Sequence, residues 1–279
     1  MTEPTYVDWI RAARASHERL VGLASGLTED QLTSQSYDTE WSVAQVLSHL
    51  GSGAEIFTLI LDATLAGEES PGIDRFREVW AVWDAKEPVA MRDDSLAANT
   101  ELIARLEGVT PEQAAAASFS FGPFSVDLAG YVRMRLSEHA LHTWDVAEFL
   151  DPAAVVAQDA VELLLPGVGM MAGRGGKPAD PAFSVELVTT DGLGSWAVVA
   201  GDPVTFGPAE EGAAYDGEVA LPAESLLRLI AGRLDPDHTP VGVTESGSRG
   251  LVDLRAVFPG FCESICMPGS PHQGSPRPP

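Results

Sequence analysis

The apolar residues of this sequence change their spacing near the middle of the chain. In the first half they recur every three or four residues, as on one face of a helix, in four segments that end before Asp151-Pro152. In the second half, residues 183–188 and 195–200 alternate apolar and polar side chains, which is typical of half-buried strands. Because the residue before a proline avoids the α conformation, the helical part is expected to end near Asp151.

We therefore predict an α+β protein of two domains and a tail. Residues 1–151 should form a four-helix bundle, since helices with one apolar face bury those faces against one another. Residues 152–260 should form a small α+β domain of strands and helices. Residues 261–279 are rich in proline and glycine, cannot build a core, and are predicted to be a disordered tail.

Local signals set the expected ends of the elements. The second helix has the clearest start, because Ser42 can cap it and Gln45 completes a capping box three residues later. A fourth helix is predicted to follow a cap at Ser125 and to end at Phe149. Proline and glycine predict an irregular segment at 68–92. The other expected elements are helices at 6–25, 95–106, 153–165 and 224–234 and a further strand around Val219.

The charge and composition exclude several classes of partner. The chain carries 41 acidic and 17 basic residues, a net charge of −24, and the basic residues are scattered. Such a surface repels a phosphate backbone, so we expect no nucleic-acid partner. No apolar run approaches the roughly 20 residues of a membrane helix, and the N-terminus lacks a secretory signal. We therefore expect a cytoplasmic protein with no membrane partner.

The two cysteines, Cys262 and Cys266, lie near the end of the chain. Two cysteines make no disulfide framework, which agrees with a reducing cytosol. Together with His272 they offer three ligands for a metal. We expect an incidental pair, because a proline- and glycine-rich tail makes a poor metal site.

Three residues on two predicted helices form a candidate metal site. Glu138 and His142 are four residues apart, so their side chains lie on one helix face and can bind one ion. Asp145 continues that face and can accept a hydrogen bond from a ligating imidazole, whereas His139 lies about 100° away. His49 borders the apolar face of the second helix and can supply a third ligand. Three ligands leave positions open, as in a catalytic metal site.

These residues also have ordinary structural interpretations. A Glu and a His four apart are common on solvated helix faces, and a single His such as His49 is often a hydrogen-bonded core residue. His17, on the apolar face of the first helix, is expected to be a buried histidine rather than a pocket residue. Arg135, one turn before Glu138, is expected at the surface, although it can brace that carboxylate or contact a substrate. Spacing alone leaves both interpretations open.

Longer motifs carry a resemblance to a known family. Residues 41–50, WSVAQVLSHL, resemble the second-helix signature of the mycothiol-dependent maleylpyruvate isomerase family, within the DinB-like superfamily: a Trp and, eight residues on, a His. Residues 138–145, EHALHTWD, resemble its fourth-helix signature, Glu-x3-His before Trp-Asp, and the separation of about ninety residues is also similar. Residues 226–233, LLRLIAGR, resemble a run in the family's C-terminal domain, which is itself similar to sterol carrier proteins.

This resemblance implies a fold, a metal site and a chemistry. The fold is a DinB-like bundle followed by a small α+β domain, and the metal ligands are His49, Glu138 and His142, usually of zinc. The cosubstrate is mycothiol, a small thiol whose metal-activated thiolate adds to the double bond of maleylpyruvate, permits rotation and departs. An Arg of the C-terminal domain has a critical role, which we assign to Arg233 with Arg228 as the alternative. It is equally possible that both are ordinary arginines on the surface of a helix.

Three functions stay open at this point. The expected one is a mycothiol-dependent isomerase or thiol S-transferase that acts on a small electrophilic substrate. The second is a DinB-like metal-dependent hydrolase that uses metal-bound water, for which only Asp145 or His139 offers a general base. The third is a non-enzymatic metal- or ligand-binding module, whose metal would have closed four-ligand coordination.

Overall fold

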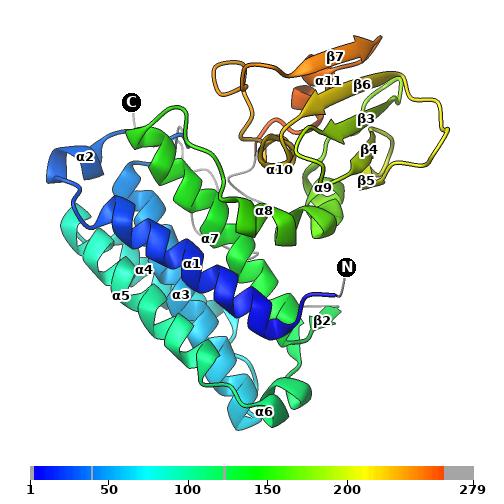
Figure 1. Ribbon diagram of the computed structural model, residues 1–279. Helices are drawn as coiled ribbons and strands as arrows, with labels where there is room; N and C mark the ends of the chain where they lie inside the picture. The colour runs from blue at the N-terminus through cyan, green and yellow to red at the C-terminus, as the bar shows by residue number, and fades with distance from the viewer. Residues whose placement is uncertain (1–2, 39, 122–123, 261–279) are drawn as a thin grey trace. The chain divides into compact units, whose positions relative to one another are not determined.

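The computed structural model describes residues 3–38, 40–121 and 124–260 (Figure 1). They form two compact units, one ending at Ala154 and the other beginning at Val155. The first unit is built from helices and one short hairpin, and the second contains a five-stranded sheet. The predicted α+β class, with a helical domain before a sheet-containing one, is therefore confirmed. The predicted tail and both cysteines lie outside the described residues.

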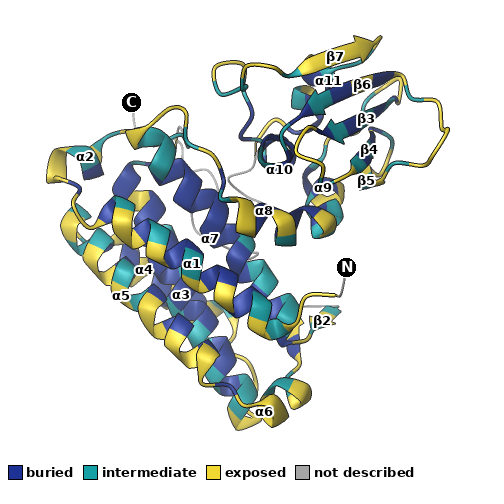
Figure 2. Cartoon of the chain, viewed as in Figure 1, coloured by how far each residue is buried: buried dark blue, intermediate teal, exposed yellow. Residues whose placement is uncertain are grey.

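Four long helices form the bundle of the first unit. α1 packs against α5 and α7, and α3 packs against α5, α7 and the shorter α4. Figure 2 shows that their inner sides are buried and their outer sides exposed, as expected of amphipathic helices. The bounds are α1 Tyr6–Ala24, α2 Glu29–Thr33, α3 Val43–Ala66, α4 Ile73–Asp84, α5 Pro88–Glu107, α6 Pro111–Ala116, β1 Phe119–Phe121, β2 Phe124–Val126 and α7 Leu128–Leu150.

Capping side chains explain where the two longest helices begin. The predicted capping box of α3 is present, because the Gln45 N–H donates to Ser42 Oγ at 3.3 Å and the Ser42 N–H donates to Gln45 Oε1 at 2.9 Å. The predicted cap of α7 was wrong. Asp127 caps this helix by accepting a hydrogen bond from the Gly130 N–H at 2.8 Å, and Ser125 lies in β2.

The prediction of an irregular segment at 68–92 is wrong for most of its length. α4 occupies residues 73–84 and buries Phe76, Val79, Trp80 and Trp83, the spacing of one helix face. Pro88 is the first residue of α5, a position where its missing N–H costs no hydrogen bond and its fixed φ suits the helix. The third predicted helix, at 95–106, therefore starts too late, because Pro88 begins this helix instead of breaking it.

α3 is the core helix of the bundle. By length and composition it is the one described helix that is apolar enough to cross a membrane. Most of that segment is buried inside the protein, which is also the pattern of a central helix in a soluble bundle.

The sheet of the second unit has the strand order β5-β4-β3-β6-β7. β3 pairs in parallel with β6, and the other neighbours are antiparallel. β3 alternates between buried and half-buried residues, with Val185 and Leu187 in the core. The bounds are α8 Gln158–Leu164, a 3-10 turn Leu165–Gly167, α9 Gly169–Gly175, β3 Ser184–Thr189, β4 Ser195–Val199, β5 Thr205–Pro208, β6 Gly217–Leu221, α10 Ala223–Ile230, β7 Thr244–Gly247 and α11 Leu251–Val257.

The two strands predicted from alternation are confirmed as β3 and β4, and the further strand expected around Val219 is confirmed as β6. The predicted helix at 224–234 corresponds to α10 but ends earlier, because Gly232 adopts a left-handed φ of 68°. α8 also starts later than predicted.

Gly51 of α3 has no room for a side chain. A Cβ there would lie 2.2 Å from the ring of the buried Trp83, whereas a Cβ at Gly22 of α1 would meet nothing within 4 Å. We expect Gly51→Ala to lower the free energy of unfolding by about 1–3 kcal/mol through overpacking. Gly22→Ala should raise it by up to about 1 kcal/mol through helix propensity. Urea denaturation followed by tryptophan fluorescence measures both, and stabilisation by both substitutions would contradict the packing at Gly51.

Candidate metal centre

The packing of α3 against α7 brings the three predicted ligands together. His49 comes from the first turns of α3, and Glu138 and His142 come from the middle of α7. One oxygen of Glu138, Oε2, lies 3.2 Å from His49 Nε2 and 3.7 Å from His142 Nε2. One donor atom from each residue lies within 4.8 Å of the others. Two imidazole nitrogens and a carboxylate oxygen therefore converge on one point.

This donor set fits a divalent metal. The side chains of His49, Glu138 and His142 are 13, 11 and 9% exposed. Glu138 Oε1 is buried and has no hydrogen-bond partner among the described residues. A buried carboxylate oxygen without a partner is costly, and a cation beside it removes that cost. Two nitrogens and one oxygen are ligands that Zn²⁺ and similar ions accept.

The protonation of the cluster also suits metal binding. Burial acts to raise the pKa of Glu138, but the hydrogen bond from His49 and the nearby positive charges outweigh it and lower that pKa below its usual value. Burial lowers the pKa of His49, although its hydrogen bond to Glu138 opposes this. At neutral pH the cluster therefore holds an ionised carboxylate and a neutral imidazole, the forms that bind metals.

Asp145 fixes the orientation of His142. His142 Nδ1 donates a hydrogen bond to Asp145 Oδ2 at 2.7 Å, and the Asp145 side chain is fully buried. Because Nδ1 carries the proton, Nε2 presents its lone pair toward Glu138 and His49. Asp145 thus accepts from the imidazole of His142, as its position on the same helix face predicts.

Trp41 covers the two imidazoles. Its ring centroid lies 5.0 Å from that of His49 and 6.0 Å from that of His142, in tilted contact with both. The Trp41 carbonyl accepts hydrogen bonds from Gln35 Nε2 at 2.6 Å and Ser36 Oγ at 2.8 Å, which fix the loop before α3. In the sequence, Trp41 stands out only as the Trp of the second-helix motif, eight residues before His49. That spacing was the available signal for its place beside the imidazoles.

His139 faces a different part of the bundle, as its position on α7 predicts. Its Nδ1 lies 2.9 Å from Ser16 Oγ and 3.2 Å from Thr143 Oγ1. The ring of His17 packs edge-on against it, with centroids 5.8 Å apart. His17 is buried, as expected, and its Nε2 is bonded to Thr100 Oγ1 at 2.9 Å. Neither histidine belongs to the cluster of His49, Glu138 and His142.

The prediction that Arg135 lies at the surface is wrong. Arg135 is 3% exposed, and its Nη2 donates hydrogen bonds to the Leu50 carbonyl at 2.8 Å and to Asn99 Oδ1 at 2.5 Å. Burial lowers the pKa of Arg135 to about 10, with attraction to Glu138 opposing the shift. The guanidinium is therefore still charged at neutral pH.

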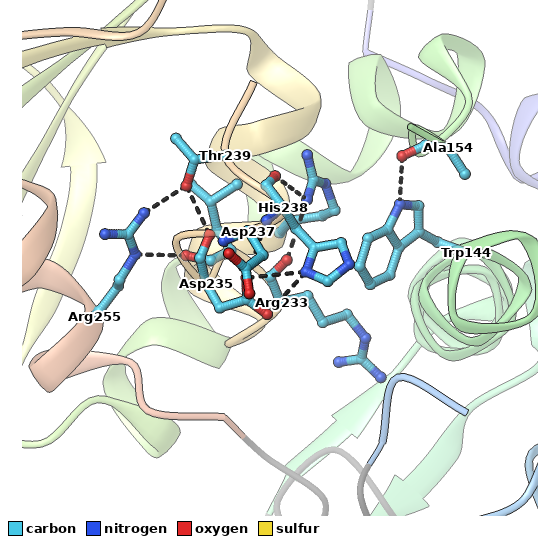
Figure 3. A network of polar contacts seen from close by, with 10 residues as sticks. Trp144, Ala154, Arg233, Asp235, Asp237, His238, Thr239 and Arg255 are labelled. Atoms are coloured by element: carbon cyan, nitrogen blue, oxygen red, sulfur yellow. Dashed lines mark hydrogen bonds and ion pairs between the residues drawn. The ribbon is translucent and has the colours of Figure 1, made fainter. Parts of the chain in front are cut away.

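The second unit carries the two arginines singled out in the sequence. Arg228 lies in the last turn of α10, and Arg233 lies beyond the end of that helix, in the segment that Figure 3 shows. Arg228 holds Glu224 with two hydrogen bonds of 2.8 and 3.0 Å and also donates to the Arg233 and His238 carbonyls. Arg233 lies just past the end of the helix and donates to the Ala231 carbonyl at 3.1 Å. Arg228 thus supports the turn that carries Arg233.

The segment after Arg233 is held by a polar network that sequence reasoning missed (Figure 3). Asp235 Oδ1 accepts from the backbone N–H groups of Asp237 and His238 at 2.8 and 3.0 Å, and both Asp235 oxygens contact His238 Nδ1 at 2.9 Å. Arg255 donates to Thr239 Oγ1 at 2.5 Å and to the Leu234 carbonyl at 2.7 Å. An Asp that accepts hydrogen bonds from backbone N–H groups two and three residues later is typical of a turn. Asp235 was therefore the signal in the sequence for this network.

Figure 3 also shows the end of the first unit, where Trp144 Nε1 donates to the Ala154 carbonyl at 2.8 Å. This bond fixes the chain that leaves α7. The same Trp144 ring packs edge-on against Tyr37, with centroids 4.8 Å apart. Trp144, an apolar member of the predicted fourth helix and part of its motif, is therefore a packing residue of the bundle.

The comparisons with known proteins agree with this architecture. Residues 13–147 match the family model described as mycothiol maleylpyruvate isomerase N-terminal domain. Two similar solved structures are a mycothiol-dependent maleylpyruvate isomerase and a histidine-to-alanine mutant of it. Each is 17% identical, with a TM-score of 0.65 over 90% of this chain and 98% of the other. At this identity the likeness establishes a shared fold. No curated protein matches the chain.

His17 predicts a pH dependence of stability. Burial, with the charges of Arg135 and Arg14, lowers its pKa from 6.5 to about 4. The folded protein thus favours neutral His17, a contribution that is complete above pH 6.5 and lost as the pH falls toward 4. Relative to His17→Gln, the wild-type protein should lose about 2 kcal/mol of its free energy of unfolding between pH 7 and pH 4. Urea denaturation at both pH values measures this, and identical losses in the two proteins would contradict it.

Proposed function

We propose that this chain, whose residues 13–147 match the mycothiol maleylpyruvate isomerase N-terminal domain, is a metal- and mycothiol-dependent enzyme acting on a small electrophilic substrate. The observation that carries the proposal is the convergence of His49 Nε2 and His142 Nε2 on Glu138 Oε2. Isomerisation is the favoured reaction, because the family model and the solved relatives are described as maleylpyruvate isomerases. Thiol transfer is the alternative outcome of the same first step.

We propose His49, Glu138 and His142 as the ligands of one divalent metal, with Zn²⁺ as the first candidate. A divalent cation held by three protein ligands has a further position open and lowers the pKa of a thiol that occupies it. The protein side chains support this role in different ways. Asp145 keeps the lone pair of His142 Nε2 pointed at the cluster, and Trp41 packs against the two imidazoles.

The isomerisation balances without an oxidant or a proton donor from the protein. The thiolate electron pair forms a C–S bond to the conjugated double bond, and the π pair moves into the adjacent carbonyl as an enolate. Rotation about the new single bond follows. The enolate then re-forms the double bond while the C–S bond breaks, which returns the thiolate. In thiol transfer, protonation of the enolate carbon would instead retain the C–S bond.

A substrate such as maleylpyruvate carries two carboxylates, which a positively charged side chain would bind. We propose Arg233 for this role. Arg228 is the alternative, and its guanidinium holds Glu224 and the backbone carbonyls of Arg233 and His238. The anchored turn that follows α10 supports Arg233, since a substrate-binding cation works best on a rigid backbone. The proposal includes a cytosolic location, where a small-molecule thiol is kept reduced.

The hydrolytic alternative requires a general base beside the metal. Both candidates have other partners: Asp145 accepts from His142 Nδ1, and His139 faces Ser16 on the other side of α7. We therefore favour a thiol as the nucleophile. The non-enzymatic alternative is also less favoured, because three ligands leave the open position that catalysis requires.

The first test is calorimetric titration of mycothiol into metal-loaded and metal-stripped protein. We expect binding only to the metal-loaded form. His142→Ala should lose metal binding and thiol binding together, because one of three ligands is gone. Thiol binding that is equal with and without metal, or full turnover by metal-stripped His142→Ala protein, would overturn the proposal.

A second test concerns Asp145. Asp145→Asn removes the charge that fixes the His142 tautomer, so it should weaken metal affinity by about 10–100-fold. Asp127→Asn is the matched control, since it makes the same change at the capping position of the same helix, where Asn serves equally well. Competition with a chromogenic chelator measures both. Equal affinities of Asp145→Asn and Asp127→Asn proteins would exclude a role for Asp145 in the site.

A further inference from the structure

Arg135 joins three helices at the level of the metal centre. It lies on α7 one turn before Glu138, and its Nη2 reaches the carbonyl of Leu50, the residue after His49 on α3. The same Nη2 donates to Asn99 Oδ1 on α5. One buried guanidinium thus contacts the backbone beside one proposed ligand and lies next to another on its own helix.

Asn99 closes this junction. Its Nδ2 donates to the Leu50 carbonyl at 3.3 Å and to the Ser95 carbonyl at 2.9 Å, while its Oδ1 accepts from Arg135. The Leu50 carbonyl therefore receives side-chain donors from two other helices. Asn99 is itself 2% exposed, so these bonds have no competition from solvent.

Gly53 of α3 lies where the guanidinium of Arg135 approaches that helix. A Cβ at Gly53 would lie 3.0 Å from Arg135 Nη1, tighter than ordinary packing allows. A glycine inside a helix costs about 1 kcal/mol relative to alanine, so its presence needs a compensating reason. The close approach of Arg135 to α3 supplies one.

Stability alone does not explain a charge in this position. Burial of an ionised group costs several kcal/mol, and apolar residues of similar volume often stabilise a core as well or better. The pKa of Arg135 remains near 10, so the charge persists at neutral pH. The remaining explanation for a buried arginine here is twofold. Its hydrogen bonds hold α3 and α5 against α7, and its charge attracts Glu138.

We propose that Arg135 is a positioning residue, which sets the separation and register of α3 and α7 so that His49 and Glu138 meet at the metal. The inference rests on the proposed function, since it takes these residues as ligands. It predicts that Arg135 acts on metal affinity and coordination geometry more than on the stability of the metal-free fold.

The test compares four proteins: wild type, Arg135→Met, Arg135→Lys and Tyr131→Phe. Tyr131 is the matched control, because it lies one turn earlier on α7, is fully buried and donates a hydrogen bond to the Phe57 carbonyl of α3. Its substitution weakens the same helix pair away from the ligands. Chelator competition gives Zn²⁺ affinity, the visible absorption of Co²⁺-loaded protein reports coordination geometry, and thermal denaturation of metal-free protein gives Tm.

We expect Arg135→Met to weaken Zn²⁺ affinity by about 10–100-fold and to change the Co²⁺ spectrum. Arg135→Lys keeps the charge and should recover part of both. Tyr131→Phe should lower Tm while affinity stays within about twofold of wild type. Should Arg135→Met not fold, Asn99→Ala removes one acceptor of the guanidinium and should weaken affinity by a smaller factor.

Each outcome bears on a different statement. Wild-type affinity and spectrum in Arg135→Met would overturn the positioning role while leaving the metal site intact. Parallel losses of affinity and Tm in Arg135→Met and Tyr131→Phe would overturn it too, by reducing Arg135 to a packing residue. A wild-type protein that binds neither Zn²⁺ nor Co²⁺ would instead refute the proposed function.

Discussion

The carboxylate of Glu138 is ionised inside a helical bundle, and its desolvation has to be offset within a few ångströms. Such burial costs several kcal/mol for an isolated ion. The structure offsets it chiefly through the hydrogen bond from His49, and the positive charge of Arg135 makes the smallest contribution, so that the pKa of Glu138 falls below its usual value in spite of burial. The packing of α3 on α7 is what brings these groups together, so the chemistry of the site depends on that helix contact.

Sequence reasoning succeeded where one helix determines the answer. The spacing of Glu138 and His142 places both on one side of α7. The capping box at Ser42 fixes where α3 begins, and with it the helix position of His49. It failed where a second helix determines the answer. Arg135 was expected at the surface, because nothing local distinguishes a buried arginine from an exposed one. Its burial depends on Gly53 and Asn99, which lie far away in the sequence.

The errors in the fold have a similar origin. Pro88 serves equally as a helix breaker and as a first helical residue, and only the buried face of the preceding α4 decides between them. Ser125 and Asp127 are both residue types that cap helices well. Ser125 cannot cap α7, because it is paired with β1 in the hairpin, so Asp127 caps the helix. β7 is exposed along its length and so lacks the apolar alternation by which β3 and β4 were found.

The charges of the cluster give a physical reason why a thiolate suits this site. With Glu138 and Asp145 as carboxylates and Arg135 as a cation, the buried groups sum to one negative charge, which attracts a divalent ion. That ion would leave one positive charge in excess, and an anionic sulfur would neutralise it. A neutral ligand would leave the charge uncompensated in a site of low polarity, where it is costly. The balance of charges around Glu138 would therefore favour an anion as the remaining ligand of the proposed metal, and Arg135 is part of that balance.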